Sequence, residues 1–529
     1  MKLRVVGILA ILAASVCLSF LTAPVKFERI ADNVVLANPV MPARIISKID
    51  DRVDALSSRF PDHFLLYQES SSSATDNDDA SKNGVYLSSV NEDGEVKIWR
   101  QWKNNLNAPI GSRGFLLNTG YVLLAGSSAN ETESDDGASL YSEFTSGAHG
   151  FLQILDVDGV VVWEHQGCFV EEGRQQECLH HDVHPMENGN LLITAYKKYN
   201  SEELLDKNYR WRASEEQTHL LLDVIYEVRP FYGKEVANCS SGKRWCTKVI
   251  WRWELVDHIG DFDPGKITLN YVNIDSQTKD LGDFSARPVD QSLITSVDYD
   301  SKRDEILLTA KHHNEVWVID HSVSTASAMG KAGDLIYRWG NIANYSVAAA
   351  KAKQPAQLAN IVDAKWGQRG ATLLLLGNSP LTNASDKNRA ADSRFGAEVV
   401  QVPLPLDESG GYILDKETFG PLMAWSLYGP NQALKRGHLA PLSNTEFIIG
   451  RSPRTLQKIK ARAQDRAGNI IDEKTTWTTT MPPIGACSSQ AGDAGCAEIA
   501  DMSVITRDSV HLTNFRMRLK RKGLTFGGE

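Results

Sequence analysis

The sequence has no excess of positive charge. Its 529 residues include 56 Lys and Arg against 66 Asp and Glu, which gives a formal net charge of −10. Proteins that bind nucleic acid by releasing counterions need a basic face. The one basic run is of a kind typical of solvated tails, and it consists of Arg516, Arg518, Lys520, Arg521 and Lys522. Nucleic acid is therefore not an expected partner.

Long apolar runs are also missing, except at the N-terminus. Lys2 and Arg4 precede an apolar stretch from Val5 to about Val25, a pattern typical of an export signal. Cleavage after Ala23 would remove this stretch, whereas the uncleaved stretch is long enough to anchor the chain in a membrane. We therefore expect the rest of the protein to be exported, to the periplasm or the extracellular space.

Cysteine is scarce, with seven residues in the chain. Cys17 lies in the apolar N-terminal stretch. We expect three local disulfides, each adding roughly 2.5–3 kcal/mol by limiting the unfolded chain, as suits an oxidising compartment. Reduced, buried cysteines are the alternative that the spacing leaves open. The expected pairs are Cys168 with Cys178, Cys239 with Cys246, and Cys487 with Cys496.

What the sequence does contain is a repeat. An apolar strand, a turn with Asp or Gly and a strand ending in Trp recur six times, and a further apolar strand follows all but the sixth unit, 471–477. The opening strands of the six units are expected at Val85–Val90, Phe151–Leu155, Val224–Val228, Val316–Ile319, Val399–Val402 and Leu456–Ile459.

Such units are sheets too small to bury both faces alone, and radial stacking solves this problem. The sequence therefore predicts an all-β fold, a six-bladed β-propeller over residues 83–529. Residues 1–25 are assigned to the signal or membrane anchor. Residues 26–82 are assigned to a short lead-in with a helix over 42–60 and a Ser- and Asp-rich loop. A solenoid is disfavoured because the spacing between the units is unequal.

The densest chemistry lies in the segment Cys178-Leu-His-His-Asp-Val-His184. Its three histidines could ligate a metal, but no remote His, Asp or Glu with motif spacing completes such a site. Neither a metal nor another cofactor is therefore expected. Hydrogen bonding of these histidines and Asp182 within the inner strands of the propeller is the structural alternative.

This segment, followed by Asn188-Gly-Asn-Leu-Leu192, resembles the second blade of the bacterial arylsulfotransferase (aryl-sulfate sulfotransferase) family. Each shared motif is weakly specific, whereas their number and order are specific. They extend from the first blade to Arg451 and include Trp251-Arg-Trp-Glu-Leu-Val-Asp-His258, Asn314-Glu-Val-Trp-Val-Ile-Asp-His-Ser322 and Gly333-Asp-Leu-Ile-Tyr-Arg-Trp-Gly-Asn341.

The resemblance implies a two-step transfer in the central funnel of the propeller. A histidine attacks an aryl sulfate to form a sulfohistidine, cationic side chains stabilise the sulfuryl oxygens, and a phenol then accepts the group. An aryl sulfate or another anionic small molecule is thus the expected ligand.

At three positions the sequence has a different residue from the family pattern. Leu293 and Thr295 stand where the family has His and Asn. Lys311 stands where the family has Arg, which keeps the charge but loses the bidentate fork.

The most serious departure concerns the nucleophile. Val362 stands where the resemblance places the nucleophilic histidine. No histidine occurs between His321 and His438, so a different alignment of this segment restores none.

Three functional hypotheses follow. The first is a diverged, non-catalytic member of the family that binds an anionic small molecule or an envelope partner. The second is an active, nucleotide-independent sulfotransferase with a rearranged histidine. The third is a hydrolase or metal-dependent enzyme centred on residues 180–184. The expected catalytic side chains are His181, His438 and Lys311, and the expected ligand-binding side chains are His180, His184, His258, His312 and Asp363.

Overall fold

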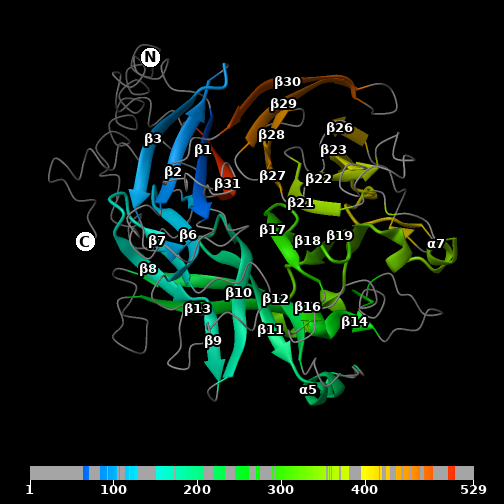
Figure 1. The fold of residues 1–529 in the computed structure, drawn as a ribbon. Helices are drawn as coiled ribbons and strands as arrows, with labels where there is room; N and C mark the ends of the chain where they lie inside the picture. Colours follow the sequence, from blue (N-terminus) through cyan, green and yellow to red (C-terminus); the bar gives the residue numbers. More distant parts are fainter. Residues whose placement is uncertain are drawn as a thin grey trace, which may run out of the picture.

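The computed structural model confirms the six-bladed β-propeller, with blades that follow one another around a centre (Figure 1). The N-terminal signal and the helix expected over 42–60 lie outside the described residues. The structure describes residues 63–70, 84–91, 93–103, 106–107, 114–117, 119–128, 151–171, 174–207, 209, 219–232, 245–260, 270, 272–273, 289–290, 292–352, 356, 358, 360–367, 371–380, 395–415, 418–419, 425–428, 437–442, 446–451, 455–464, 470–480 and 498–506.

The first three blades use the two ends of the chain and its first half. From the inner to the outer strand, the first comprises β31 (Glu498–Thr506), β1 (His63–Ser70), β2 (Gly84–Val90) and β3 (Val96–Lys103). The second comprises β5 (Phe115–Leu116) with β4 (Leu106–Asn107), then β6 (Val122–Ser128), β7 (Phe151–Leu155) and β8 (Val161–Gln166). The third comprises β10 (Arg174–Pro185) with its hairpin partner β9 (Cys168–Glu171), then β11 (Leu191–Tyr199), β12 (Leu220–Tyr232) and β13 (Trp245–Glu254).

The other three blades each have four strands in chain order. The fourth comprises β17 (Ile294–Asp300), β18 (Glu305–Ala310), β19 (Glu315–Asp320) and β20 (Tyr337–Gly340). The fifth comprises β21 (Asn360–Trp366), β22 (Thr372–Pro380), β23 (Phe395–Pro403) and β26 (Trp425–Tyr428). The sixth comprises β27 (Gly437–Pro441), β28 (Glu446–Arg451), β29 (Thr455–Gln464) and β30 (Ile470–Thr480).

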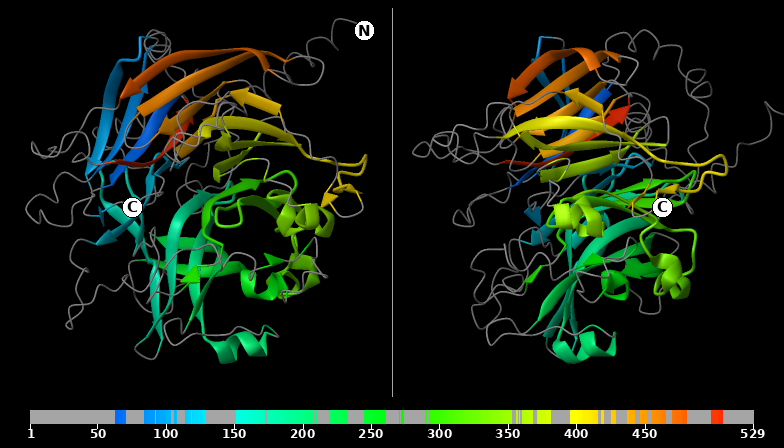
Figure 2. Two further views of the ribbon diagram at one scale, coloured as in Figure 1. Left: turned by 45° about the vertical axis from the view of Figure 1, so that its right-hand side comes forward. Right: turned by 90° about the vertical axis from the view of Figure 1, so that its right-hand side faces the viewer.

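Small elements decorate the blades. The long strands of the third blade reach the bottom of both views in Figure 2, with α5 (Ser201–Asp206) at their end. No helix in the described part of the chain is long and apolar enough to cross a membrane. The other elements are α6 (Thr325–Ala328), α7 (Val347–Ala352), η3 (Leu255–His258), η4 (Lys331–Gly333), η5 (Ile342–Asn344), β14 (Ile259–Gly260), β15 (Val272–Asn273), β16 (Val289–Asp290), β24 (Leu414–Asp415) and β25 (Thr418–Phe419).

All six expected opening strands are confirmed, and each lies in the third strand of a blade: β2, β7, β12, β19, β23 or β29. The Trp-ended strand that follows is the outer strand of the same blade. The next apolar strand already belongs to the following blade. The unit that recurs in the sequence therefore crosses a blade boundary.

The first blade corrects the expected lead-in. The segment His63–Ser70 lies within residues 26–82, yet it forms β1 and pairs with β2 on one side and with β31 on the other. The same pairing supplies the strand that the sixth sequence unit lacks, because the chain returns to its own beginning. The inner strands β10, β17, β21, β27 and β31 contact one another in succession. The second blade fills the remaining place in the ring, because β8 contacts β12 and β13 of the third blade and an apolar cluster joins β1 and β2 to β6.

Two of the motifs that carry the family resemblance serve the core. Glu315 and Arg338, from β19 and β20, are both fully buried and form an ion pair, with Nε of Arg338 2.8 Å from Oε2 of Glu315. Trp317 and Asn344 donate further hydrogen bonds to the same carboxylate, at 2.8 and 2.7 Å. The buried charges of these two motifs are thus structural partners, and they belong to β19 and β20, the two outermost strands of the blade.

One expected disulfide falls on a paired hairpin. Cys168 lies opposite Cys178 in the β9/β10 ladder, and Cys178 and Cys246 each take part in a disulfide. The full scheme of three pairs stays a prediction, since Cys239, Cys487 and Cys496 lie outside the described residues.

Candidate functional site

Three consecutive inner strands, β10, β17 and β21, each contain a bulge that interrupts the ladder with the next strand. The extra residues are, in turn, His180–Asp182, Thr295 and Val362. Bulges re-aim side chains and are common beside active sites. These bulges include the positions at which the resemblance places reacting groups.

The bulge in β10 holds a compact group that we call the His180 cluster, formed by Tyr196, His180, His181, Asp223 and Ser292. Nε2 of His180 lies 2.9 Å from Oδ1 of Asp223, and both side chains are fully buried. Nδ1 of His180 lies 3.1 Å from Nδ1 of His181. The ring of His180 stacks on that of Tyr196, with centroids 3.7 Å apart. A carboxylate and two imidazoles therefore form a continuous chain of contacts.

The backbone holds His181 in a conformation that is uncommon for a side chain of its size. Its φ is +47°, in the left-handed region. Such conformations persist when the surrounding structure fixes them, and they gather at functional sites. Here the bulge fixes the residue, which is 8% exposed beside a fully buried His180.

The turn between β18 and β19, which contains Lys311 and His312, is attached through its backbone to the segment that includes Ser292 of the His180 cluster. The backbone N–H groups of Lys311 and His312 donate to the carbonyl oxygens of Leu293 and Ser292, both at 3.1 Å. The hydroxyl of Ser292 in turn donates to Asp223. Lys311 and His312 are both partly exposed. The structure thus places four of the expected site residues, 180, 181, 311 and 312, at one end of the third and fourth blades.

Two departures from the family pattern have structural consequences here. Leu293, which stands in place of a histidine, packs against Tyr196 and Cys178 of the third blade. Val362, which stands in place of the nucleophile, is buried in an apolar cluster with Leu374 and Leu376. Both side chains contribute packing where the resemblance expects polar chemistry.

Further along the inner strands, acids and bases compensate each other. Nδ1 of His184 lies 3.2 Å from Oδ1 of Asp298, and Nζ of Lys365 lies 2.9 Å from Oδ1 of Asp363. Burial raises the pKa of the Asp298 carboxyl, but the hydrogen bond and charge of His184, with smaller effects of Lys365 and the Trp366 N–H, lower it to about 2. His184 and Lys365 therefore each have a carboxylate partner.

Asp363, expected to bind ligand, also links two blades. Its Oδ1 accepts the N–H of Ala364, and its Oδ2 accepts the N–H of Leu439 in β27, at 2.9 and 2.8 Å. His438 precedes Leu439 in the same strand, but its side chain lies outside the described part of the structure. The expected roles of Asp363, His184 and His438 stay predictions.

His258 lies apart from these groups. It is fully buried in η3, where its Nδ1 is 3.0 Å from Asp334 and its Nε2 is 2.9 Å from the carbonyl oxygen of Ala328. Its ring stacks on Trp253, with centroids 5.0 Å apart. Both ring nitrogens therefore have protein partners, as a structural histidine requires.

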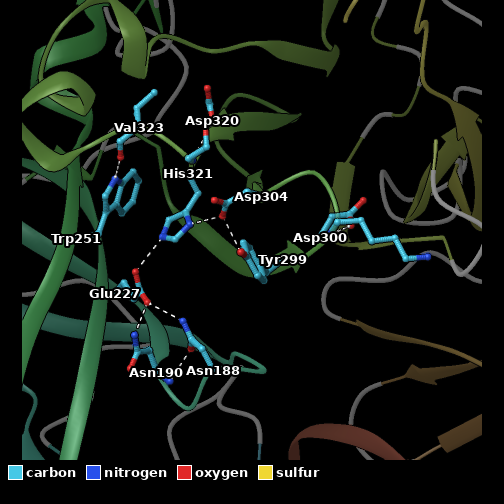
Figure 3. A network of polar contacts seen from close by, with 12 residues as sticks. Asn188, Asn190, Glu227, Trp251, Tyr299, Asp300, Asp304, Asp320, His321 and Val323 are labelled. Atoms are coloured by element: carbon cyan, nitrogen blue, oxygen red, sulfur yellow. Dashed lines mark hydrogen bonds and ion pairs between the residues drawn. The ribbon is translucent and has the colours of Figure 1, made fainter. Parts of the chain in front are cut away.

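A second polar network joins the third and fourth blades near the opposite ends of their inner strands, and we call it the Glu227 network (Figure 3). Nε2 of His321 lies 3.1 Å from Oε2 of Glu227, and its Nδ1 lies 2.6 Å from Oδ1 of Asp304. Tyr299 donates to the same oxygen of Asp304, at 2.6 Å. Asn188 and Asn190, from the turn after β10, donate to Glu227. One imidazole thus bridges two carboxylates.

Sequence reasoning missed Asp223, Ser292 and Asp298. A signal for Asp223 was present, because a lone carboxylate in the run Leu220-Leu-Leu-Asp-Val-Ile225 must have a partner if the strand is buried.

The described part of the chain offers no metal site, because no group of three or more His, Cys, Asp or Glu side chains in those ranges is placed to hold an ion.

Comparison with known proteins adds little to this geometry. No family model and no curated protein matches the chain. Among solved structures, the periplasmic gluconolactonase PpgL of Pseudomonas aeruginosa is 11% identical with a TM-score of 0.35, covering 84% of this chain and 99% of its own. Hsv2 of Kluyveromyces lactis is 11% identical with a TM-score of 0.31, covering 75% and 93%. The hydrazine synthase of Kuenenia stuttgartiensis is 10% identical with a TM-score of 0.31, covering 71% and 70%. Likenesses this distant carry no functional argument, and the chain is assigned to the β-propeller fold without a family.

Proposed function

We propose that the protein is an exported β-propeller that binds an anionic small molecule, such as an aryl sulfate, beside the His180 cluster. The observation that supports the proposal is the attachment of the Lys311–His312 turn to Leu293 and Ser292, because Ser292 in turn donates to Asp223, the carboxylate beside His180. A lysine and several imidazole groups supply the charge-assisted donors that sulfate oxygens require.

The family resemblance supports the choice of ligand, and the departures from it support divergence. Val362 is packed among apolar side chains, so the position of the family's nucleophile holds no reacting group. Binding without turnover by the usual route is what this substitution predicts.

Calorimetric titration with phenyl sulfate, and with phenol as the uncharged control, tests the proposal. Saturable binding of phenyl sulfate that weakens with salt, without binding of phenol, is the expected result. Equal binding of both compounds, or of neither, would overturn the proposal.

Sulfuryl transfer through His181 is a second candidate function, favoured by the contacts that run from Asp223 through His180 to His181. In the first step, a ring nitrogen of His181 would form a bond to sulfur as the bond from sulfur to the aryl oxygen breaks and a phenolate leaves. In the second, the oxygen of an acceptor phenol would take the sulfuryl group, lose its proton and release the imidazole.

Release of p-nitrophenol from p-nitrophenyl sulfate in the presence of a phenol acceptor measures this activity. Turnover that His181→Ala abolishes, together with a sulfated His181 peptide by mass spectrometry, would establish transfer. Absence of turnover in folded protein across several acceptors would leave binding alone.

Export is part of the proposal and rests on separate features. Lys2, Arg4 and the apolar stretch that follows them support a signal or anchor. The disulfide bonding of Cys178 and Cys246 agrees with an oxidising compartment. Thiol alkylation of the native protein, followed by peptide mass spectrometry, should find both cysteines blocked until a reductant is added.

A further inference from the structure

His321 joins two blades through the two nitrogens of one ring (Figure 3). Its Nδ1 lies 2.6 Å from Oδ1 of Asp304, in the turn between β17 and β18 of the fourth blade. Its Nε2 lies 3.1 Å from Oε2 of Glu227, in β12 of the third blade. The side chains of His321 and Glu227 are 9% and 6% exposed. The contact between the blades is therefore largely shielded from solvent.

Both carboxyl groups also receive hydrogen bonds from their own blades. Asn188 and Asn190 donate to Oε1 of Glu227, and Tyr299 donates to Oδ1 of Asp304 at 2.6 Å. When ionised, a carboxyl group has only acceptor oxygens. The imidazole ring therefore lies between two acceptors, one from each blade.

An imidazole between two acceptors needs two N–H groups, which only the imidazolium form has. Burial lowers the pKa of His321, but hydrogen bonds to Glu227 and Asp304 outweigh burial and raise it overall. This direction agrees with the geometry. A neutral His321 can donate to one carboxylate only, and its lone pair then faces the other.

Loss of one proton affects the two contacts unequally. Asp304 is the nearer acceptor, and its carbonyl oxygen also accepts the backbone N–H of His321 at 2.9 Å. His321 and Asp304 thus stay together within the fourth blade, whereas Glu227 contacts His321 only through its side chain. The remaining proton is therefore kept on Nδ1, and the lone pair on Nε2 faces Oε2 of Glu227.

The other titratable and charged groups on the surrounding elements are neutral, paired elsewhere or exposed. Tyr299 stays neutral, because burial and the hydrogen bond and charge of Asp304 raise its pKa. The rest are Arg303, paired with Asp300 and Glu305; Asp320, which accepts from Ser322; Arg252 of β13, paired with Glu177 and Glu254; Arg229 of β12, over the ring of Phe231; and the exposed Glu187, Lys248 and Lys302. Glu227 and Asp304 are thus the acids that respond to the proton of His321.

We propose that His321 is a pH-dependent link between the third and fourth blades, which as imidazolium binds both Asp304 and Glu227 and as neutral imidazole keeps Asp304 and releases Glu227. Release loosens the turn at Asn188 and Asn190, since both side chains hold the same carboxylate. The opening is local, because Asp182 joins the inner strands of the two blades independently.

The protons on the ring can be followed directly. Long-range ¹H–¹⁵N correlation spectra of protein labelled at histidine distinguish protonated from unprotonated nitrogens, and the signals lost in His321→Gln identify those of His321. Both nitrogens should be protonated at about pH 6, below the ordinary pKa of histidine, and Nε2 alone should lose its proton at a midpoint above 6.5. A neutral ring at that pH, or loss of the proton from Nδ1, would overturn the proposal.

Glu227→Gln tests the consequence for the junction. Its amide N–H can donate to the neutral Nε2, while its oxygen still accepts from Asn188 or Asn190. Hydrogen exchange of the segment 186–190, corrected for the intrinsic effect of pH, measures the opening. Protection should fall about tenfold in the unmodified protein as the pH rises through the measured midpoint, and by less than about twofold in Glu227→Gln.

Two controls separate local opening from other effects of pH. Glu187→Gln changes an exposed glutamate of the same turn and should behave like the unmodified protein. The strand Glu446–Arg451 of the sixth blade should keep its protection over the same range. An equal loss of protection in all three proteins, or in both segments, would contradict the link. If Glu227→Gln does not fold, the titration of the ring nitrogens decides.

Discussion

Asp182 of the third blade accepts a hydrogen bond from the backbone N–H of Val297 in the fourth blade, at 3.1 Å. Its other oxygen accepts the N–H of Val183, the residue that follows it, at 3.0 Å. Asp363 makes the same pair of contacts between the fifth and sixth blades. The aspartate of the His-His-Asp segment therefore links the third and fourth blades by a hydrogen bond to the backbone.

Replacing Asp182 by Ala should lower the free energy of unfolding by about 2–4 kcal/mol, because two buried N–H groups lose a charged acceptor. Urea titration measures the loss. Asp158→Ala, in an exposed turn of the second blade, is the matched control and should change stability by less than about 0.5 kcal/mol. Similar losses of stability in both variants would argue against a stabilising link between the blades through Asp182.

The buried pair of Glu315 and Arg338 makes a second prediction. Arg338→Met removes the cation and leaves Glu315 charged and buried, which should cost about 3–5 kcal/mol. The double variant Arg338→Met, Glu315→Gln should recover part of this loss, since the amide carries no charge and its one oxygen still accepts from either Trp317 or Asn344. Thermal unfolding of the three proteins checks this, and a double variant less stable than Arg338→Met would contradict it.

The Glu227 network should make stability depend on pH. Burial lowers the pKa of His321, but hydrogen bonds to Glu227 and Asp304 outweigh burial and raise it above 6.5. A raised pKa stabilises the fold fully below pH 6.5, and this contribution is lost as the pH rises through the raised value. Burial raises the pKa of Glu227, but hydrogen bonds from His321 and Asn190 lower it below 4.5 overall. Its contribution is present above pH 4.5 and is lost as the pH falls through the lowered value.

His321→Gln should therefore reduce the melting temperature most between about pH 5 and 6, above the ordinary pKa of a glutamate and below that of a histidine, and less once the pH exceeds the raised pKa of His321. Glu227, Asp304 and Tyr299 are the titratable groups in direct contact with this histidine. Tyr299 stays neutral over the range, because burial and, to a smaller extent, the hydrogen bond and charge of Asp304 raise its pKa. Calorimetric scans at several pH values measure the difference. A constant difference across the range would show that the imidazole acts only by packing.

Anion binding should depend on Lys311 more than on other lysines of the same blade. Lys311→Ala should weaken phenyl sulfate binding by about tenfold, corresponding to about 1.4 kcal/mol. Lys302→Ala changes an exposed lysine in the turn after β17, at the other end of the blade, and should bind like the unmodified protein. Equal weakening in the two variants would indicate a long-range effect of charge rather than a site.

Local pattern was sufficient for most of the fold. The run Phe151–Leu155 was expected as a strand and forms β7 with the same bounds, because a short, mostly apolar run and a following Asp-Gly turn define it locally. The inner strands were harder. Their ladders are broken by bulges, and β31 pairs with a strand more than 400 residues away, which no local periodicity reports.

The sequence predicted the histidines of the candidate site, but it did not predict the side chains that contact them. His180 and His181 were evident from the sequence, and the structure attaches the turn of Lys311 and His312 to Leu293 and to Ser292 of the same cluster. Asp223 was not expected, because its role depends on a contact across the sheet with β10 and on Ser292 from another blade. His258 shows the converse, since a histidine in a shared motif lies in a buried structural contact.

The pairing of β1 with β31 also sets the order in which the molecule can be completed. The inner strand of the first blade is Glu498–Thr506, so a ribosome must translate the chain from β1 through Thr506 before that blade can form. Until then β1 presents an open edge, of the kind that invites pairing with other chains. Because ring closure joins such distant segments, it should be a slow and late event. Pairing of β31 with β1 thus closes the ring. A chain that terminated before β31 would leave the propeller open, with an unpaired edge strand that is prone to aggregation.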